Sequence, residues 1–212
     1  MLTSYNRFLF LILLLIPSIG STQVGLKFGL NFANVTKTSD FNSSSRSGFH
    51  GGIFMATNPD KIIGAHIELL YSKQGYNFKD KNNSGSVDLN YLLIPAYISF
   101  NFTRYLSIMG GLNIAYLIQA GVDTIPSTTG GTSGIKISDY FKKLDFGFGI
   151  GAETHPLSGL VLGARLNYSL GNLVDYVNDS DNFSKENFIP KVNVKNNLFQ
   201  VYVGWLFEQY YR

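Results

Sequence analysis

The chain lacks cysteine altogether and carries few charges. Because none of its 212 residues is Cys, disulfides, thiolate metal ligands and a lipid attached to a cysteine at the end of a leader are excluded. Asp, Glu, Lys and Arg make up 15% of the chain, whereas a typical soluble domain has about 25%. The 17 Lys and Arg exceed the 14 Asp and Glu too slightly to indicate nucleic-acid binding.

Long apolar runs are also missing, apart from one near the beginning. The segment Phe8–Ile16 (FLFLILLLI) follows a single basic residue, Arg7, and is ended by Pro17 and several small residues. A spanning helix needs roughly 20 apolar residues, so this run is too short for an anchor and is typical of a secretory leader. We therefore expect a cleaved signal peptide over residues 1–22. No later stretch is long enough to cross a bilayer as a helix.

After the leader, apolar residues alternate with small or polar ones. In the first segment Val24, Leu26 and Phe28 point to one side, while Gly25 and Lys27 point to the other. No helical period of comparable strength occurs after the leader. Segments with this alternation lie at residues 24–35, 49–56, 62–78, 89–102, 106–119, 143–154, 160–170 and 197–207.

The connections between these eight segments alternate between long and short. The short ones are Thr57–Lys61, Thr103–Tyr105 and His155–Gly159. The long ones, rich in Ser, Thr, Gly, Asn and Asp, are Thr36–Ser47, Lys79–Ser86, Gly121–Tyr140 and Asn172–Asn196. Bacterial outer-membrane barrels have short periplasmic turns and long external loops. The pattern predicts one domain over residues 24–207, an all-β, eight-stranded antiparallel up-and-down transmembrane β-barrel with a short C-terminal tail over 208–212 and no further domain.

Alternation alone fits a soluble barrel too, because only the direction of the apolar rows differs. The apolar rows carry no charge, and the opposite rows consist largely of Gly with few charges. A row facing water would need many Lys and Glu for solubility, whereas a narrow eight-stranded interior needs small side chains. We therefore expect the apolar rows to face lipid. The alternative is a soluble, lipocalin-like ligand-binding barrel in the periplasm.

The central parts of the opposite rows hold four formal charges, two of each sign. They are Lys27, Glu68, Asp145 and Arg165. An unpaired buried charge is very costly, so we expect these four to pair across the lumen as a structural polar network. A gated path for protons or ions is the less favoured interpretation. Lys143 and Glu153 share the same row nearer the rims.

Pro95 interrupts the fourth segment. Proline removes one hydrogen-bond donor from the ladder, and a closed barrel has no free edge to accommodate that loss. We therefore expect a local bulge at Pro95, or a water bound in the lumen.

Sequence motifs typical of catalytic and metal-binding sites are missing as well. The chain contains no Gly-x-Ser-x-Gly elbow, no HExxH and no phosphate-binding loop. The inward His50 and His66 are expected to belong to the polar filling of the lumen, because no acidic cluster at ligand spacing accompanies them. The carboxylates of Asn172–Asn196 lack calcium-loop spacing and indicate a solvated loop. We expect no enzymatic activity, no cofactor and no metal. An outer-membrane enzyme would need a nucleophile or acid–base set, which the sequence does not show.

Four short stretches resemble PorT-type outer-membrane β-barrel proteins of Bacteroidota. Ile67–Gly75 (IELLYSKQG) resembles that family's ELLYSQQG, and Leu89–Pro95 (LNYLLIP) resembles its LNYLEIP, with Leu93 where an acidic residue often stands. Asp145–Gly151 and Gly163–Gly171 are similar to its sixth and seventh strands. The Leu93 departure removes one expected carboxylate from the lumen. No catalytic residues carry over, because the family's motifs supply none.

The resemblance implies an outer-membrane protein, since founding members of that family are associated with type IX secretion and gliding. We expect a non-enzymatic barrel with a structural, adhesive or secretion-accessory role. Its expected partners are outer-membrane lipid, the barrel-assembly machinery and components of a secretion system, and not nucleic acid. The alternating residues Phe199–Phe207 look like the C-terminal signal that assembly machinery reads.

Overall fold

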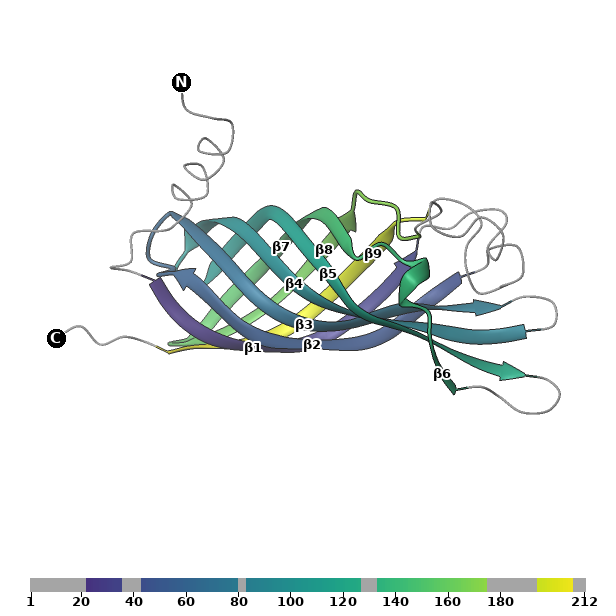
Figure 1. The fold of residues 1–212 in the computed structure, drawn as a ribbon. Coiled ribbons are helices and arrows are strands. Elements are labelled where there is room, and N and C mark those ends of the chain that lie inside the picture. The colour runs from purple at the N-terminus through teal and green to yellow at the C-terminus, as the bar shows by residue number, and fades with distance from the viewer. Residues whose placement is uncertain (1–21, 36–42, 80–82, 127–132, 175–193, 208–212) are drawn as a thin grey trace, which may run out of the picture.

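The described residues form a closed ring of eight long antiparallel strands (Figure 1). The computed structural model describes residues 22–35, 43–79, 83–126, 133–174 and 194–207. The long strands are β1 (Thr22–Val35), β2 (Ser43–Thr57), β3 (Ile63–Lys79), β4 (Asn83–Thr103), β5 (Leu106–Pro126), β7 (Leu144–Leu157), β8 (Leu160–Ser169) and β9 (Asn196–Phe207). A short strand β6 (Ser133–Lys136) pairs with β5, and η2 (Ser138–Tyr140) is a single 3-10 turn.

Each long strand pairs with its neighbours along the chain, and β1 pairs with β9 to close the ring. The predicted eight-stranded up-and-down barrel is thereby confirmed. Within the described residues, none of the helical structure is long and apolar enough to span a membrane. The predicted signal peptide over 1–22 falls almost entirely on residues outside the described part, although Thr22 belongs to β1. The tail over 208–212 also lies outside it.

The apolar rows face outward, as predicted. On β1, Phe28 is 59% exposed and Leu30 is 54% exposed, while Lys27, which directly precedes Phe28, is completely buried. The other strands repeat this arrangement, with Leu112, Ile98 and Ile150 among the most exposed apolar side chains. A water-soluble barrel would bury these rows, so the soluble lipocalin-like alternative is excluded.

Aromatic side chains gather at the two borders of this apolar surface. Near one end, ring pairs join neighbouring strands, as at Phe49–Tyr71 and Phe148–Tyr168, whose centroids are 6.0 and 5.5 Å apart. Near the turns at the other end lie Trp205 and the pair Phe100–Phe102. Aromatic girdles at both interfaces are typical of outer-membrane barrels. The barrel therefore spans the outer membrane, and we call the Phe49–Tyr71 border the outer aromatic belt.

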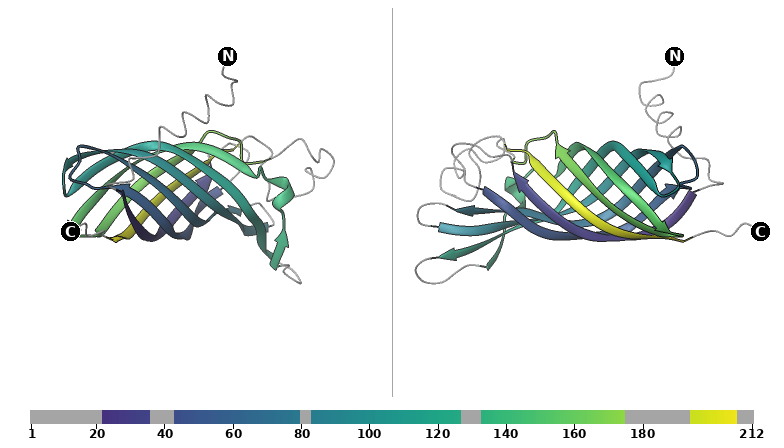
Figure 2. Two further views of the ribbon diagram at one scale, coloured as in Figure 1. Left: turned by 60° about the vertical axis from the view of Figure 1, so that its left-hand side comes forward. Right: turned by 180° about the vertical axis from the view of Figure 1, so that it is seen from behind.

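Strands β2 to β5 extend well beyond the ends of the other long strands on the side of the outer aromatic belt, as the ribbon shows (Figures 1 and 2). β2 begins at Ser43, β4 begins at Asn83 and β5 runs to Pro126, so large parts of three predicted loops are strand. The prediction of loops over Thr36–Ser47, Lys79–Ser86 and Gly121–Tyr140 was wrong in this respect. Ser, Gly, Asn and Asp have low intrinsic preference for strands, but pairing with a neighbouring strand overrides that preference. The predicted loop Asn172–Asn196 lies mostly outside the described residues.

An apolar core holds this extension together. The inward side chains of its strands are large and buried, as at Tyr76, Phe78, Val87 and Val122, whereas the inward rows in the central part of the barrel are small and polar as predicted. Residues from the segments that follow β6 and β8 cover the core. They are Ile137, Phe141, Leu173 and Val174. We call this part of β2–β5, with its cover, the extracellular sheet.

Pro95 interrupts the ladder without shifting it. β3 and β4 pair at Ile67–Ala96 and again, in the same register, at Leu70–Leu93. The register shift in β4 lies instead against β5, between Asn90 and Tyr91. The expected bulge is therefore not at Pro95 but close to the outer aromatic belt, where the extracellular sheet begins.

Gly75 in β3 has a backbone conformation that other residues rarely adopt. Its φ is +145°, and a Cβ built there would overlap the carbonyl oxygen of Val87 on β4. We expect Gly75→Ala to lower the free energy of unfolding by about 2 kcal/mol, because both the conformation and the overlap are unfavourable. Urea titration of the barrel in lipid vesicles measures this loss. The matched change Gly110→Ala on β5 has only one ordinary contact, at 3.6 Å, and equal losses from both changes would contradict the explanation.

Candidate functional site

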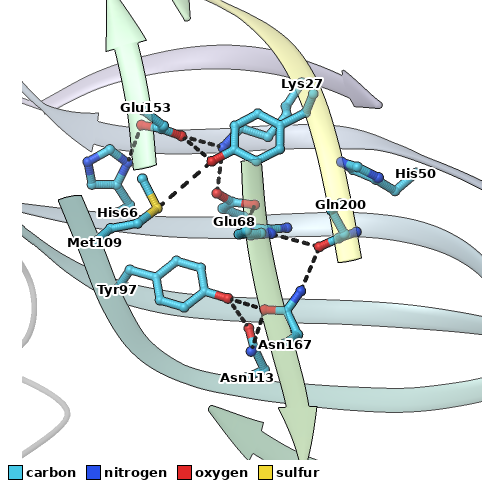
Figure 3. Close-up of polar contacts among 12 residues, drawn as sticks. Lys27, His50, His66, Glu68, Tyr97, Met109, Asn113, Glu153, Asn167 and Gln200 are labelled. Carbon is cyan, nitrogen blue, oxygen red and sulfur yellow. Dashed lines mark hydrogen bonds and ion pairs between the residues drawn. The ribbon is translucent and has the colours of Figure 1, made fainter. Parts of the chain in front are cut away.

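Lys27 lies at the centre of the lumen because glycines flank it on both sides. It pairs in register with Gly52 of β2 and Gly204 of β9, which leave space for its long side chain. Its Nζ is 2.7 Å from Oε1 of Glu68 and 3.0 Å from Oε1 of Glu153 (Figure 3). All three side chains are completely buried. Two carboxylates therefore stabilise one buried ammonium group.

Arg165 of β8, two strands from β1 around the ring, completes the charge balance. It pairs in register with Gly151 of β7, and its Nη1 is 2.8 Å from Oε2 of Glu68. Its Nε donates a hydrogen bond to Oε1 of Gln200 at 2.7 Å. Glu68 thus joins both cations with its two oxygens. Two cations and two carboxylates, completely or almost completely buried, meet in one layer, and we call Lys27, Glu68, Glu153 and Arg165 the lumen charge layer.

Neutral polar side chains extend the network toward the outer side. Asn31 binds the Ser72 hydroxyl and the His50 ring, and it accepts a bond from Gln200 at 2.7 Å. On the facing wall, the Tyr97 hydroxyl lies 2.6 Å from Oδ1 of Asn113 and 2.7 Å from Oδ1 of Asn167 (Figure 3). These contacts involve side chains from seven of the eight long strands. The layer is therefore a rigid partition.

The structure brings together three of the four charges that the sequence singled out. Glu68 contacts both Lys27 and Arg165, whereas Asp145 does not reach them. Asp145 is half-buried near the outer end of β7, where it accepts a hydrogen bond from the Ser169 hydroxyl at 2.7 Å. Glu153 takes the second acidic position. Sequence reasoning placed Glu153 near a rim because it ended the strand at residue 154, but β7 runs on to Leu157.

The two inward histidines have different partners. His50 lies 2.8 Å from Oδ1 of Asn31, and Nδ1 of His66 lies 3.6 Å from Oε2 of Glu153. In the described ranges no group of three or more His, Cys, Asp and Glu side chains is arranged to hold a metal ion.

The lumen has little free space on the outer side of the lumen charge layer. The cavity there has a volume of about 40 Å³, enough for a water molecule or two. Leu93 lines it, so part of its wall is apolar. A barrel filled in this way holds side chains rather than a solute path.

A second polar cluster lies on the outside of the extracellular sheet. Nε of Arg46 is 2.7 Å from Oδ1 of Asp88, and Nζ of Lys73 is 3.5 Å from Oδ2 of the same carboxylate. Asn77 accepts a further bond from Arg46 at 3.2 Å. These side chains are about a quarter to a third exposed and lie next to the outer aromatic belt. They present a fixed polar face to the surroundings of the cell.

The sequence profile of the family described as outer membrane protein beta-barrel domain matches residues 17–175, which is most of the chain. No curated protein sequence matches the chain.

Similar solved structures come from bacterial outer-membrane proteins. The attachment invasion locus protein Ail of Yersinia pestis, in complex with the heparin analogue sucrose octasulfate, is 14% identical with a TM-score of 0.51, covering 88% of this chain and 99% of that one. Ail without that ligand gives 15% identity, a TM-score of 0.50 and the same coverage. Neisserial surface protein A is 13% identical with a TM-score of 0.46, covering 87% and 97%. At these identities the similarity to the two Ail structures shows the fold alone.

Proposed function

Because this chain belongs to the outer membrane protein beta-barrel domain family, we propose that it is a closed, non-enzymatic barrel that holds its extracellular sheet as a contact surface. The observation that carries this proposal is the continuation of β2 to β5 past the outer aromatic belt, over an apolar core of their own. A connection between strands needs only a few residues, so a packed extension needs another reason. Rigid display of a surface is the reason that fits.

The two faces of the extracellular sheet support this role. Its inner face packs against the apolar core, since Tyr76, Val87 and Val122 are buried there. Its outer face carries the Arg46–Asp88–Lys73 cluster, which is fixed by mutual ion pairs. Contact residues on a rigid scaffold bind without the entropy cost of ordering a loop. The outer face therefore suits a specific partner.

The finer role that we propose is accessory to secretion, as in PorT-type proteins. The two stretches that carry the clearest resemblance, Ile67–Gly75 and Leu89–Pro95, lie side by side on β3 and β4. They pair at Tyr71–Leu92 and at Lys73–Asn90, where the barrel passes into the extracellular sheet. The proposed partners are therefore a component of secretion machinery, outer-membrane lipid around the apolar rows and the barrel-assembly machinery during insertion.

A protein is a better candidate than a sulfated polysaccharide for the extracellular partner. The structure of Ail with sucrose octasulfate shows a heparin analogue on that protein. In the present chain Asp88 lies between Arg46 and Lys73 and neutralises much of their charge. A polyanion needs several uncompensated cations, whereas a protein surface can match mixed charges.

Photo-crosslinking from the extracellular sheet tests the proposed function in intact cells. A photoreactive side chain at the exposed Lys79 or at the exposed Ser47 should give the same protein adduct. The matched control at Ile98, 62% exposed on the lipid-facing row, should give none. Absence of a protein adduct from both sheet positions would overturn the proposal. Loss of the adduct when heparin is added would favour a polysaccharide partner instead.

A further inference from the structure

A cavity of about 420 Å³ opens at the periplasmic end of the barrel. It is lined by turn residues 58–60, 104–105 and 155–159, together with Gln23 of β1 and Leu206 of β9. Sites for small ligands have volumes of about 300–1,000 Å³, so this space is large enough for one. We call it the periplasmic cavity.

Arg104 brings a positive charge to the rim of the periplasmic cavity. Its guanidinium carbon lies 4.7 Å from the centroid of the Tyr105 ring, and its Nη2 donates a hydrogen bond to the Tyr105 hydroxyl at 2.6 Å. Both contacts hold the side chain in place. Among the described residues no carboxylate forms an ion pair with Arg104. Its other N–H groups are therefore available to an anionic ligand, and a guanidinium group binds phosphate especially well.

Asp60 brings a negative charge to the same rim from the turn between β2 and β3. Its backbone N–H donates a hydrogen bond to Oδ1 of Asn58 at 2.9 Å. Within the described part of the chain its carboxylate forms no ion pair, neither with Arg104 nor with Lys61, which does not line the cavity. Asn101 holds this turn beside the end of β4, because its Nδ2 donates a hydrogen bond to the Lys61 carbonyl oxygen at 2.6 Å. The cavity therefore offers charges of both signs from neighbouring turns.

The periplasmic cavity lies next to the apolar surface of the barrel. Gly159 lines the cavity and lies against Trp205, since a Cβ built at Gly159 would be 3.2 Å from Cε2 of that ring. Trp205 belongs to the lipid-facing row of β9 and is 49% exposed. Tyr105 and Leu157, which also line the cavity, are 49% and 65% exposed. Tryptophan and tyrosine at a membrane border lie at the level of the lipid headgroups, so the cavity opens beside the inner leaflet.

The charges of the periplasmic cavity favour a zwitterionic ligand. A simple anion on Arg104 would be repelled by Asp60, and a simple cation on Asp60 would be repelled by Arg104. A group that carries both a phosphate and a primary ammonium matches the two side chains, because an ammonium group donates hydrogen bonds to a carboxylate. The position beside the inner leaflet favours a phospholipid as its source, since the acyl chains can cover the apolar rows while the headgroup enters the cavity. At the inner end, the largely buried His155 offers a further polar contact.

We propose that the periplasmic cavity binds the headgroup of an inner-leaflet phospholipid that carries a phosphate and a primary ammonium, as phosphatidylethanolamine does. Arg104 donates hydrogen bonds to the phosphate, and Asp60 accepts them from the ammonium. A choline headgroup has no N–H to donate, and a phosphoglycerol headgroup has no cation, so both should bind less well. The proposal depends on the orientation of the barrel in the membrane and not on the contact role of the extracellular sheet.

Native mass spectrometry tests this preference. The folded barrel, identified by heat-modifiable migration, is released from detergent after incubation with equal amounts of dioleoyl phosphatidylethanolamine, phosphatidylcholine and phosphatidylglycerol. Phosphatidylethanolamine should be retained about two- to fivefold more than each of the other lipids, which is the factor expected of one partly exposed ion pair. Equal retention of the three lipids would overturn the proposal.

Two substitutions at the rim separate the roles of the two charges. Asp60→Asn should abolish the preference for phosphatidylethanolamine over phosphatidylcholine, whereas Arg104→Gln should lower the retention of all three lipids, because each carries a phosphate. Matched controls remove the same charges elsewhere. Asp123→Asn on β5 and Lys61→Gln change exposed side chains that do not line the cavity, and both should leave the retention pattern unchanged. Equal effects of the rim variants and their controls would contradict the assignment.

Photo-crosslinking in vesicles locates the bound lipid. The probe is phosphatidylethanolamine with a diazirine beside the ester of one acyl chain. Both leaflets of the vesicles contain the probe, so the outer aromatic belt is an internal control. Adducts should concentrate in the peptides that contain Tyr105 and Leu157, and Asp60→Asn should remove this excess. Adducts spread evenly over the two borders of the barrel would overturn the proposal.

Discussion

Replacing Glu68 with alanine is expected to lower the free energy of unfolding by about 3–5 kcal/mol, the loss typical of breaking a buried ion pair. Glu68 contacts both cations of the lumen charge layer, Lys27 at 2.7 Å and Arg165 at 2.8 Å. Its removal leaves Arg165 without its carboxylate and Lys27 with Glu153 alone. Urea titration in lipid vesicles measures the change, followed by the fluorescence of Trp205, the single tryptophan of the chain.

Asp88→Ala is the matched control for this change. Asp88 also contacts two cations, Arg46 and Lys73, but these side chains are partly exposed at the outer face. Exposed ion pairs contribute roughly 0–1 kcal/mol, so the loss should be much smaller. If Glu68→Ala cost no more than Asp88→Ala, the lumen charge layer would not be the partition that its geometry indicates.

Introducing a charge on the lipid-facing row should have a comparably large effect. Leu112 is 67% exposed at the middle of the outward row of β5, midway between Leu106 and Ile118. A lysine near the bilayer midplane costs about 2–4 kcal/mol in outer-membrane barrels. We expect Leu112→Lys to reduce the free energy of unfolding in vesicles by that amount, measured by the same urea titration.

Gln119→Lys on the same strand is the control that distinguishes the effect of exposure to lipid from the effect of exposure in general. Gln119 also points outward and is exposed, but it lies beyond the outer aromatic belt, past the register shift opposite Asn90. A lysine close to or outside the interface costs about 0–1 kcal/mol. Equal losses at Leu112 and Gln119 would mean that the apolar rows do not face the membrane core.

The strand number and the lipid-facing side could be predicted because each depends on local sequence. Alternation within a segment such as Val24–Val35 fixes which side chains share a face, whatever the neighbouring strand is. The contents of the two rows then orient the face, since Phe28 and Lys27 cannot exchange places without exposing a charge to lipid. Inward glycines such as Gly52 and Gly204 also indicated a narrow, filled interior.

The depth of each side chain could not be predicted in this way. Glu153 belongs to the lumen charge layer and Asp145 does not, because register between strands fixes height, and register is a property of pairs. The extracellular sheet was missed for a related reason. Its strands contain Ser, Gly, Asn and Asp, and only cross-strand pairing together with the apolar core around Val87 makes them extended.

The pairing of β1 with β9 determines when this protein can become a barrel. Val24 lies opposite Phe207, so the first strand obtains its second neighbour only after β9 has been synthesised. Until then the free edges of β1 and β9 and the apolar rows of the eight long strands are exposed to water, and this exposure favours aggregation. The Lys27–Glu153 and Asn31–Gln200 contacts also span more than a hundred residues and form only at that stage. Insertion, closure and charge pairing are thus one late event, and its timing follows from the topology itself.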